Sequence, residues 1–230
     1  MKPGRAVAAL ASMAIGGMWL GITPGHATSM KPMNLAHITG KARQIVVGTV
    51  ASVKPGRLGS LPYVEIEVKV SETLRGMAQP TLKFKQLDTG RALDPENGRR
   101  YLGALPGMPH YVVGEQVLLF LGAPTSNSFR TTIGLQQGKL TLSAGNAANE
   151  MNNRGLFRNV SAGSAPLDVK EQSMLATSQG MVNATTLIGL VRRAVAGKWW
   201  DPVTPAPPPG GGRGNKRQVV AAAAAGVTVQ

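Results

Sequence analysis

The sequence predicts a mainly β protein, a small antiparallel barrel or sandwich with two short flanking helices and a C-terminal tail. Three observations support this fold class. Short segments rich in β-branched residues recur between residues 44 and 143, several of them alternate apolar and polar residues, and Gly or Pro separates one from the next. Apolar residues make up 43% of the 230-residue chain, which suffices for a hydrophobic core.

A short helix is expected at 34–43, before the first strand. Asn34 stands where an N-terminal cap would be, and apolar residues follow at positions that share one side of a helix. Gly40 works against the helix, because glycine in a helix costs up to about 1 kcal/mol relative to alanine.

Residues 44–53, 54–62 and 63–70 predict a β-hairpin. The first segment (QIVVGTVASV) is rich in β-branched residues, the second (KPGRLGSLP) carries the Pro and Gly typical of a turn, and the third (YVEIEVKV) alternates strictly. A strand with this alternation has one dry face and one wet face. The dry face would hold Val64, Ile66, Val68 and Val70, and the wet face Tyr63, Glu65, Glu67 and Lys69.

Further strands are expected at 81–87, 128–135 and 138–143, and residues 155–160 could add another. A long connection at 88–113 follows the first of these. Loops of this length are uncommon in compact domains unless they bind a ligand or move.

The segment QVLLFL at 116–121 lies in the most hydrophobic stretch after the N-terminus. Six residues are too few to span a bilayer, but they suit a strand. Because apolar and polar residues do not alternate, both faces should be buried. We expect one face against the barrel interior and the other under a helix at 184–197, whose apolar stripe ends at Gly197. That basic amphipathic helix could alternatively lie on a membrane surface.

The N-terminus has the pattern of a secretory signal peptide. A basic start with Lys2 and Arg5 is followed by an uncharged apolar run, and small residues stand at Gly25 and Ala27. We expect residues 1–27 to be removed, a periplasmic or secreted location, and no transmembrane span after cleavage. A retained membrane anchor is the alternative, since the apolar run approaches the shortest length that spans a bilayer.

The remaining chain is expected to form one domain over 28–200. Beyond it, residues 201–230 are rich in Pro, Gly and Ala, which predicts a disordered tail.

No motif in the sequence points to a reaction. The chain has no cysteine, which excludes thiol catalysis, iron–sulfur clusters and zinc sites built from cysteine. HExxH, GxSxG and Walker motifs do not occur, and His37 and His110 are isolated. We therefore expect no catalytic residue, no metal and no cofactor. Two alternatives stay open: acid–base work by Glu65 and Glu67, and calcium bound by acidic residues of the 88–113 connection.

The net charge of +14 is spread along the chain rather than concentrated. No segment is dense enough in Lys and Arg to predict a nucleic-acid groove, and the aromatic residues are too scattered to predict base stacking. No specific nucleic-acid partner is therefore expected. In an exported protein, the positive charge favours salt-sensitive attraction to anionic envelope polymers or lipid surfaces.

Five short motifs follow one another along the chain. They are VVGTV (46–50), ETLRG (72–76), GMP (107–109), GEQVLLFL (114–121) and GLQQGKL (134–140). In this order they resemble an uncharacterised family of secreted bacterial proteins with an OB-like or netrin-like β-barrel, and the resemblance covers residues 30–200. It implies a small antiparallel OB-like barrel with short flanking helices at 34–43 and 184–197 and a disordered C-terminal tail.

The resemblance also has implications for function. Members of that family resemble exported domains, some of them associated with matrixin-type metalloproteases. Their barrel is similar in shape to the N-terminal domain of tissue inhibitors of metalloproteases. Those inhibitors act through a cysteine at the mature N-terminus, which this chain lacks.

These observations predict an exported, non-catalytic binding or interaction module of the bacterial envelope. It would use the rim of the barrel and the loop at 88–113, with an exported protease or an anionic envelope component as partner. The alternative is a protease-associated or protease-inhibitor-like regulatory domain, and a hydrolase with an inconspicuous site is a third possibility. The candidate binding residues are Arg91, Arg99, Arg100, Tyr101, His110 and Tyr111.

Overall fold

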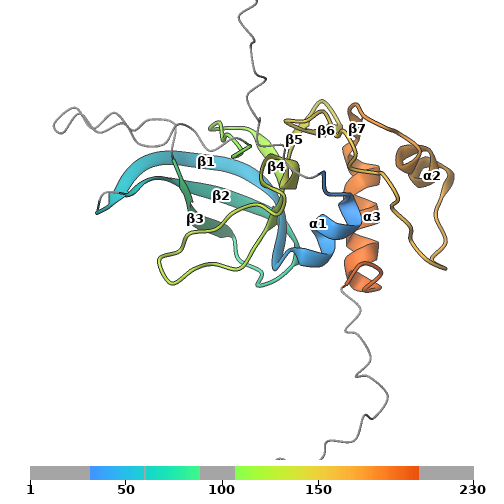
Figure 1. The fold of residues 1–230 in the computed structure, drawn as a ribbon, viewed down its shortest axis with the longest axis horizontal. Helices are drawn as coiled ribbons and strands as arrows, with labels where there is room; N and C mark the ends of the chain where they lie inside the picture. Colours follow the sequence, from blue (N-terminus) through green and yellow to red (C-terminus); the bar gives the residue numbers. More distant parts are fainter. Residues whose placement is uncertain (1–31, 60, 89–106, 202–230) are drawn as a thin grey trace, which may run out of the picture.

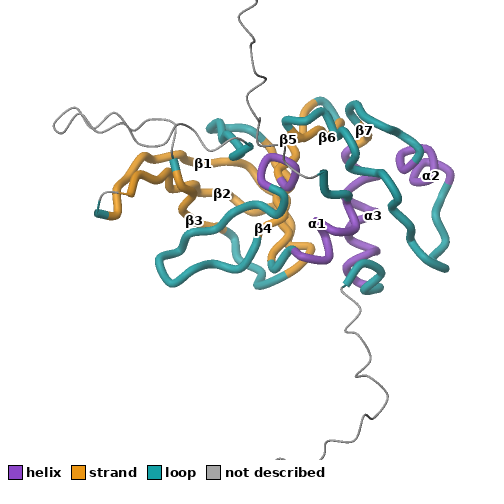
Figure 2. The backbone as a smooth tube through the Cα atoms, viewed as in Figure 1, coloured by secondary structure: helices purple, strands orange, loops and turns teal. Residues whose placement is uncertain are grey.

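The computed structural model describes residues 32–59, 61–88 and 107–201 (Figure 1). The expected signal peptide, the expected tail beyond Asp201 and most of the loop at 88–113 lie outside the described residues. The described part is mainly β, as the sequence predicts. Its helices gather at one end and a long hairpin extends toward the other (Figure 2).

The strands of the described residues form one antiparallel sheet in the order β3-β2-β1-β4-β5-β6-β7. They are β1 (Gln44–Leu58), β2 (Leu61–Arg75), β3 (Thr81–Leu87), β4 (Gln116–Leu121), β5 (Lys139–Ser143), β6 (Asn146–Asn149) and β7 (Val182–Asn183). The helices are α1 (Leu35–Lys41), α2 (Val169–Leu175), α3 (Ala184–Ala196) and the short 3-10 helix η1 (Leu135–Gly138). The two outermost strands, β3 and β7, do not pair with each other, so the hydrogen-bonded sheet is open.

The β1–β2 hairpin is longer than the sequence predicts. The turn expected at 54–62 is wrong, because both strands continue through Pro55 and Pro62 until Leu58 pairs with Leu61. Strand β4 accompanies β1 only as far as Thr49, so Pro55 lies on an open edge where its missing N–H removes no ladder hydrogen bond.

Residues 128–133 form an irregular segment that links β3 to β4. At one end, the N–H of Lys85 donates to the carbonyl oxygen of Ser128 at 3.0 Å. At the other end, the N–H of Ile133 donates to the carbonyl oxygen of Phe120 at 2.8 Å. The segment therefore spans the gap between an outer strand and a central one.

The strand expected at 128–135 is accordingly wrong. The segment makes isolated bridges at Phe129 and Thr132, to two different strands, and a continuous ladder needs a single partner strand. Positive φ angles at Gly134 (70°) and Leu135 (56°) then turn the chain into η1.

β4 is buried on both faces, as its lack of alternation predicts. One face belongs to an interior cluster between β1, β2, β3 and β4, and the other to a cluster beneath α1 and α3. The buried members of the interior cluster are Val46, Val50, Ile66, Val68, Leu82, Phe84, Val117, Leu119 and Leu121. On the opposite face, Leu118 and Phe120 pack with α3 residues such as Leu187 and Leu190.

The region between β5 and α3 contains elements that the sequence does not predict, namely β6, β7 and α2. The strand suggested at 155–160 is wrong, since these residues form turns. Two asparagines organise the region. The N–H of Asn153 donates to Oδ1 of Asn149 at 2.8 Å, and the N–H of Asn149 donates to Oδ1 of Asn153 at 3.0 Å. Asn153 is fully buried, and its amide also donates to the carbonyl oxygens of Ala147 and Gly180.

Both expected helices are present. Asn34 caps α1 by accepting a hydrogen bond from the N–H of His37 at 2.9 Å, and α3 ends at Ala196 before Gly197. Among the described residues, no helix combines the length and apolar character needed to cross a bilayer.

The N-cap of α3 gives a first testable expectation. The Oδ1 of Asn183 accepts the N–H of Thr186 at 2.9 Å. We expect Asn183→Ala to lower the free energy of unfolding by about 1 kcal/mol, because one N–H of the first turn loses its acceptor. Urea denaturation would measure the change, with Asn183→Ser as a control that keeps a capping oxygen. Equal stability of the alanine variant and the wild type would contradict the cap assignment.

Candidate functional site

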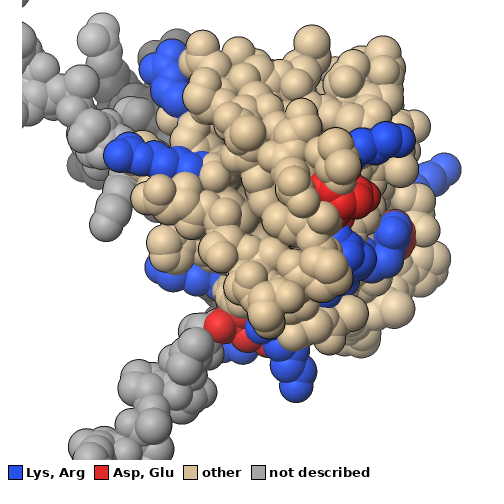
Figure 3. All heavy atoms as spheres, turned by 90° about the vertical axis from the view of Figure 1, so that its right-hand side faces the viewer, with Lys and Arg blue, Asp and Glu red and all other residues tan. Residues whose placement is uncertain are grey.

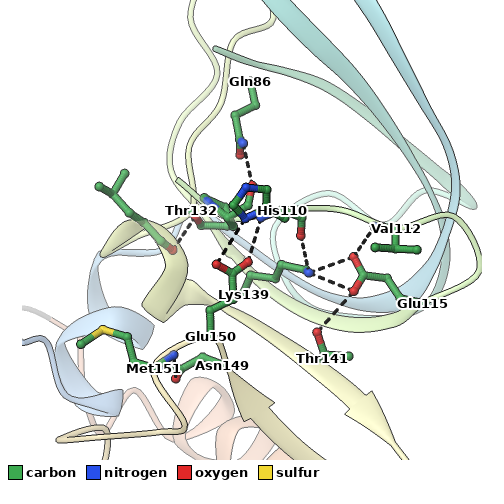
Figure 4. A network of polar contacts seen from close by, with 12 residues as sticks. Gln86, His110, Val112, Glu115, Thr132, Lys139, Thr141, Asn149, Glu150 and Met151 are labelled. Atoms are coloured by element: carbon green, nitrogen blue, oxygen red, sulfur yellow. Dashed lines mark hydrogen bonds and ion pairs between the residues drawn. The ribbon is translucent and has the colours of Figure 1, made fainter. Parts of the chain in front are cut away.

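The candidate site is built around the backbone of residues 107–115, which lead directly into β4. Figure 4 shows side chains from three other elements converging on this backbone. They are Gln86 from β3, Lys139 from β5 and Glu150 from the turn after β6. The segment is the C-terminal arm of the loop at 88–113, which the sequence singles out.

A buried ion pair lies at the centre of this network. The Nζ of Lys139 is 2.9 Å from each carboxylate oxygen of Glu115, and it also donates to the carbonyl oxygen of His110. The side chains of Lys139 and Glu115 are 4% and 13% exposed. The same carboxylate accepts the N–H of Val112 at 2.9 Å and the hydroxyl of Thr141 at 3.3 Å. Each charge is therefore matched, as a buried pair requires.

Two more side chains hold the arm in place. The Nε2 of Gln86 donates to the carbonyl oxygen of Pro109 at 2.9 Å. Glu150 accepts the backbone N–H of His110 at 2.8 Å, and its other oxygen lies 3.5 Å from Nδ1 of the same histidine. The His110 side chain is 89% exposed, so it remains available at the surface.

Tyr111 points into the interior cluster. Its ring meets Phe84 edge-on at 5.8 Å between centroids, and Nζ of Lys139 lies 5.2 Å from its ring centroid. The hydroxyl is buried and has no hydrogen-bond partner among the described residues. Burial raises the pKa of the Tyr111 hydroxyl far above its ordinary value, and the carboxylates of Glu115 and Glu150 raise it further. Tyr111 thus anchors the arm from inside.

The arm displays two valines next to this anchored backbone. Val112 and Val113 are 64% and 60% exposed. They lie in a tight turn that ends at Glu115, with Gly114 at a φ of 90°. The turn is held beside β1, since Val50 and the 114–115 backbone exchange hydrogen bonds of 2.8 and 2.9 Å. The arrangement offers a fixed apolar contact.

Arg130 lies away from the arm, beside Gln44 at the start of β1, and is half-buried. Its Nη1 donates to Oε1 of Gln44 at 2.6 Å, whereas its Nε is buried and has no hydrogen-bond partner in the part of the chain that the structure describes. Burial lowers the pKa of the Arg130 guanidinium, because desolvation penalises the charged form.

The six residues predicted as a binding site divide into two groups. Four of them lie outside the described residues: Arg91, Arg99, Arg100 and Tyr101. The other two are adjacent in the arm but face opposite ways, with His110 at the surface and Tyr111 inside.

Sequence reasoning did not identify Lys139, Glu115 and Glu150 as parts of this site. In the segment GKLTLS, the lysine occupies a position that alternation assigns to a wet face. The exposed valines do have a signal in the sequence. Two β-branched residues stand directly before Gly114, and β-branched residues are uncommon in turns.

Within the ranges that the structure describes, no three His, Asp or Glu side chains gather as metal ligands would. Glu65 and Glu67 occupy the outer face of β2, and the carboxylate of Glu67 lies 3.3 Å from Nζ of Lys83. This placement agrees with a wet strand face. Of the acidic residues considered for calcium, only Asp88 lies in the described part.

The positive charge is dispersed on the face that Figure 3 turns toward the reader. Lys and Arg side chains appear there as separate groups, with Asp and Glu beside some of them. Ion pairs reduce the free charge of the described residues, as between Arg192 and Glu72 and between Arg193 and Glu171.

Comparisons of the chain with protein families, with curated proteins and with solved structures found no match.

Proposed function

We propose that the protein is an exported, non-catalytic interaction module that binds its partner through the arm at 107–115. The observation that carries this proposal is the exposure of Val112 and Val113 on a backbone that three other elements hold in place. A contact that is already ordered loses less conformational entropy on binding than a mobile loop does. The exposed side chain of His110 would extend the same surface.

We also propose that strands β1 to β4 of the open sheet form a small OB-like barrel. Strands β1 to β4 surround the interior cluster, and residues 128–133 extend from β3 to β4. These features support a barrel whose last side is irregular rather than a regular strand. In OB-like barrels, loops at one end of the barrel contact the ligand, which agrees with a contact surface on the arm.

The proposed partner is an exported protease or an anionic component of the envelope, met in the periplasm or outside the cell. The signal-peptide pattern at 1–27 supports this location, and the net charge of +14 supports attraction to an anionic partner.

A pull-down from an envelope fraction tests the proposal. We expect the immobilised protein to retain a partner at low salt, and the double variant Val112→Ser/Val113→Ser to retain it about tenfold less, because two apolar contacts are lost. Met77→Ser is the control, since Met77 is 76% exposed but lies in the turn between β2 and β3. The retained molecule, identified by mass spectrometry, must bind the purified protein with the same dependence on the valines. An empty pull-down at low salt, or equal retention by all variants, would overturn the proposal.

A further inference from the structure

The far end of the β1–β2 hairpin extends beyond both neighbouring strands. Strand β4 pairs with β1 only from Gln44 to Thr49, and β3 pairs with β2 only from Tyr63 to Lys69. Toward the tip, the hairpin backbone bonds to residues outside the hairpin at two places: Val50 exchanges hydrogen bonds with residues 114–115, and the carbonyl oxygen of Pro62 accepts the N–H of Asp88 at 3.2 Å. In Figure 1 this end points away from α1, α2 and α3.

Two leucines form an exposed apolar tip on this hairpin. Leu58 and Leu61 are paired in register, so their side chains share one face of the hairpin. They are 43% and 41% exposed, although neither contributes to the two buried clusters. Large apolar side chains that project together into solvent often mark a contact with a partner or a membrane.

Basic residues flank the leucines. Lys54 and Arg57 are both exposed, and no acidic residue occurs from Lys54 to Tyr63. Two described carboxylates lie near the tip: Glu65 lies opposite Lys54 on one side and opposite Lys85 of β3 on the other, and Asp88, directly after β3, donates its N–H to the carbonyl oxygen of Pro62. Among the described residues, the cations Lys54, Arg57 and Lys85 therefore outnumber the two carboxylates around the tip.

The base of the tip is stiffened by Tyr63. A Cβ added at Gly56 would lie 2.5 Å from the Tyr63 ring, so glycine allows the ring to lie directly on the neighbouring backbone. The Nζ of Lys85 lies 4.9 Å from the ring centroid, and Phe129 meets the ring edge-on at 5.8 Å. The packing of Tyr63 thus fixes the hairpin backbone next to the two leucines.

An open strand edge could instead pair with a strand of another protein. Pro55 works against this in β1, because it supplies no N–H to an added strand. A partner is therefore expected to contact the side chains of the tip rather than to add a strand to the open edge of β1.

We infer that the hairpin tip binds the surface of membranes that contain anionic phospholipids. Leu58 and Leu61 would enter the boundary between headgroups and acyl chains, while Lys54 and Arg57 contact lipid phosphates. A projecting tip suits a deformable lipid surface, whereas a protein partner would need a matching pocket for the two leucines. The inference goes beyond the proposed function, because it assigns a second contact, with anionic lipid, to the hairpin tip and leaves the arm at 107–115 to the partner.

Co-sedimentation of the exported protein with lipid vesicles tests this inference. We expect binding to vesicles that contain phosphatidylglycerol, and weaker binding to pure phosphatidylcholine or at high salt. Leu58→Ser/Leu61→Ser should reduce partitioning at least about tenfold, because each leucine gains free energy on leaving water. Lys54→Gln/Arg57→Gln should reduce it by about fivefold for each charge removed.

Two control variants make the result specific. Lys41→Gln/Lys170→Gln removes the same charge from α1 and α2 and should leave partitioning nearly unchanged. Val112→Ser/Val113→Ser alters the arm and should also retain vesicle binding. Thermal melts close to wild type are expected for the tip variants, because these side chains are exposed.

The outcomes separate the two proposals. No binding to phosphatidylglycerol vesicles, or equal binding by Leu58→Ser/Leu61→Ser, would overturn the lipid assignment. A tip variant that loses a protein partner in the envelope pull-down, while the wild type ignores vesicles, would identify the tip as a protein contact and likewise overturn it. The proposed function survives either result if the pull-down still depends on Val112 and Val113.

Discussion

Phe120→Ala should lower the free energy of unfolding by about 3–5 kcal/mol, since it removes a ring from a fully packed site. Phe120 is completely buried in the cluster between the sheet, α1 and α3. The backbone around it is tied on both sides, to β1 through the pairing with Ile45 and to Ile133 through a hydrogen bond. The surroundings therefore cannot easily collapse into the cavity.

Thermal and urea unfolding would measure this effect. For a domain of this size, 1 kcal/mol corresponds to about 2–4 °C in melting temperature, so we expect a decrease of about 10 °C. Phe129→Ala is the matched control, because Phe129 is only half-buried and its loss should cost clearly less stability. A Phe120 variant that melts like the wild type would refute the placement of β4 between two cores.

Lys139→Met should cost about 3 kcal/mol, the lower end of the range for breaking a buried ion pair. The substitution keeps the length of the side chain but leaves the carboxylate of Glu115, 13% exposed, without its cation. The carbonyl oxygen of His110 also loses its donor. We place the loss at the lower end because the hydrogen bonds from Val112 and Thr141 to the carboxylate remain.

A double-mutant cycle with Glu115→Gln isolates the pair. The double variant Lys139→Met/Glu115→Gln should recover much of the lost stability, because no uncompensated charge stays buried. Urea denaturation of the four proteins provides the coupling energy. Losses that simply add would show that the two side chains do not act as a pair.

The strand faces could be predicted from the sequence because they depend on local patterns. The alternation at 63–70 places Ile66 and Val68 in the interior cluster, as the structure does. The segment at 116–121, with an unbroken apolar run from Val117 to Leu121, predicts both the limits of β4 and its burial on two faces. In each case the separation of apolar from polar residues decides which side meets water.

Hairpin length could not be predicted in the same way, because it depends on partners. Pro55, Gly56 and Pro62 are typical turn residues, yet the chain carries them inside strands. Gly56 is needed there because the Tyr63 ring covers it from the other strand, and Pro55 is tolerated because no third strand follows at that point.

The candidate site was predicted only in outline. Its position in the 88–113 loop follows from loop length, and the structure places the His110 side chain at the surface. The side chains that hold the arm are far away in sequence, at Gln86, Lys139 and Glu150. Contacts between such distant positions leave no periodic signal in a single sequence.

The irregular link at 128–133 has a consequence for how the chain folds. The β1–β2 hairpin joins residues that are neighbours in sequence, so little chain entropy is lost when Leu58 meets Leu61. The link, in contrast, must bring Phe129 to Lys85, which lies on the far side of the whole 88–113 connection. Because this contact needs both β3 and β4 in place, we expect it to form after β1 has paired with β2 and β4. The interior cluster would then be formed by four strands first and sealed afterwards.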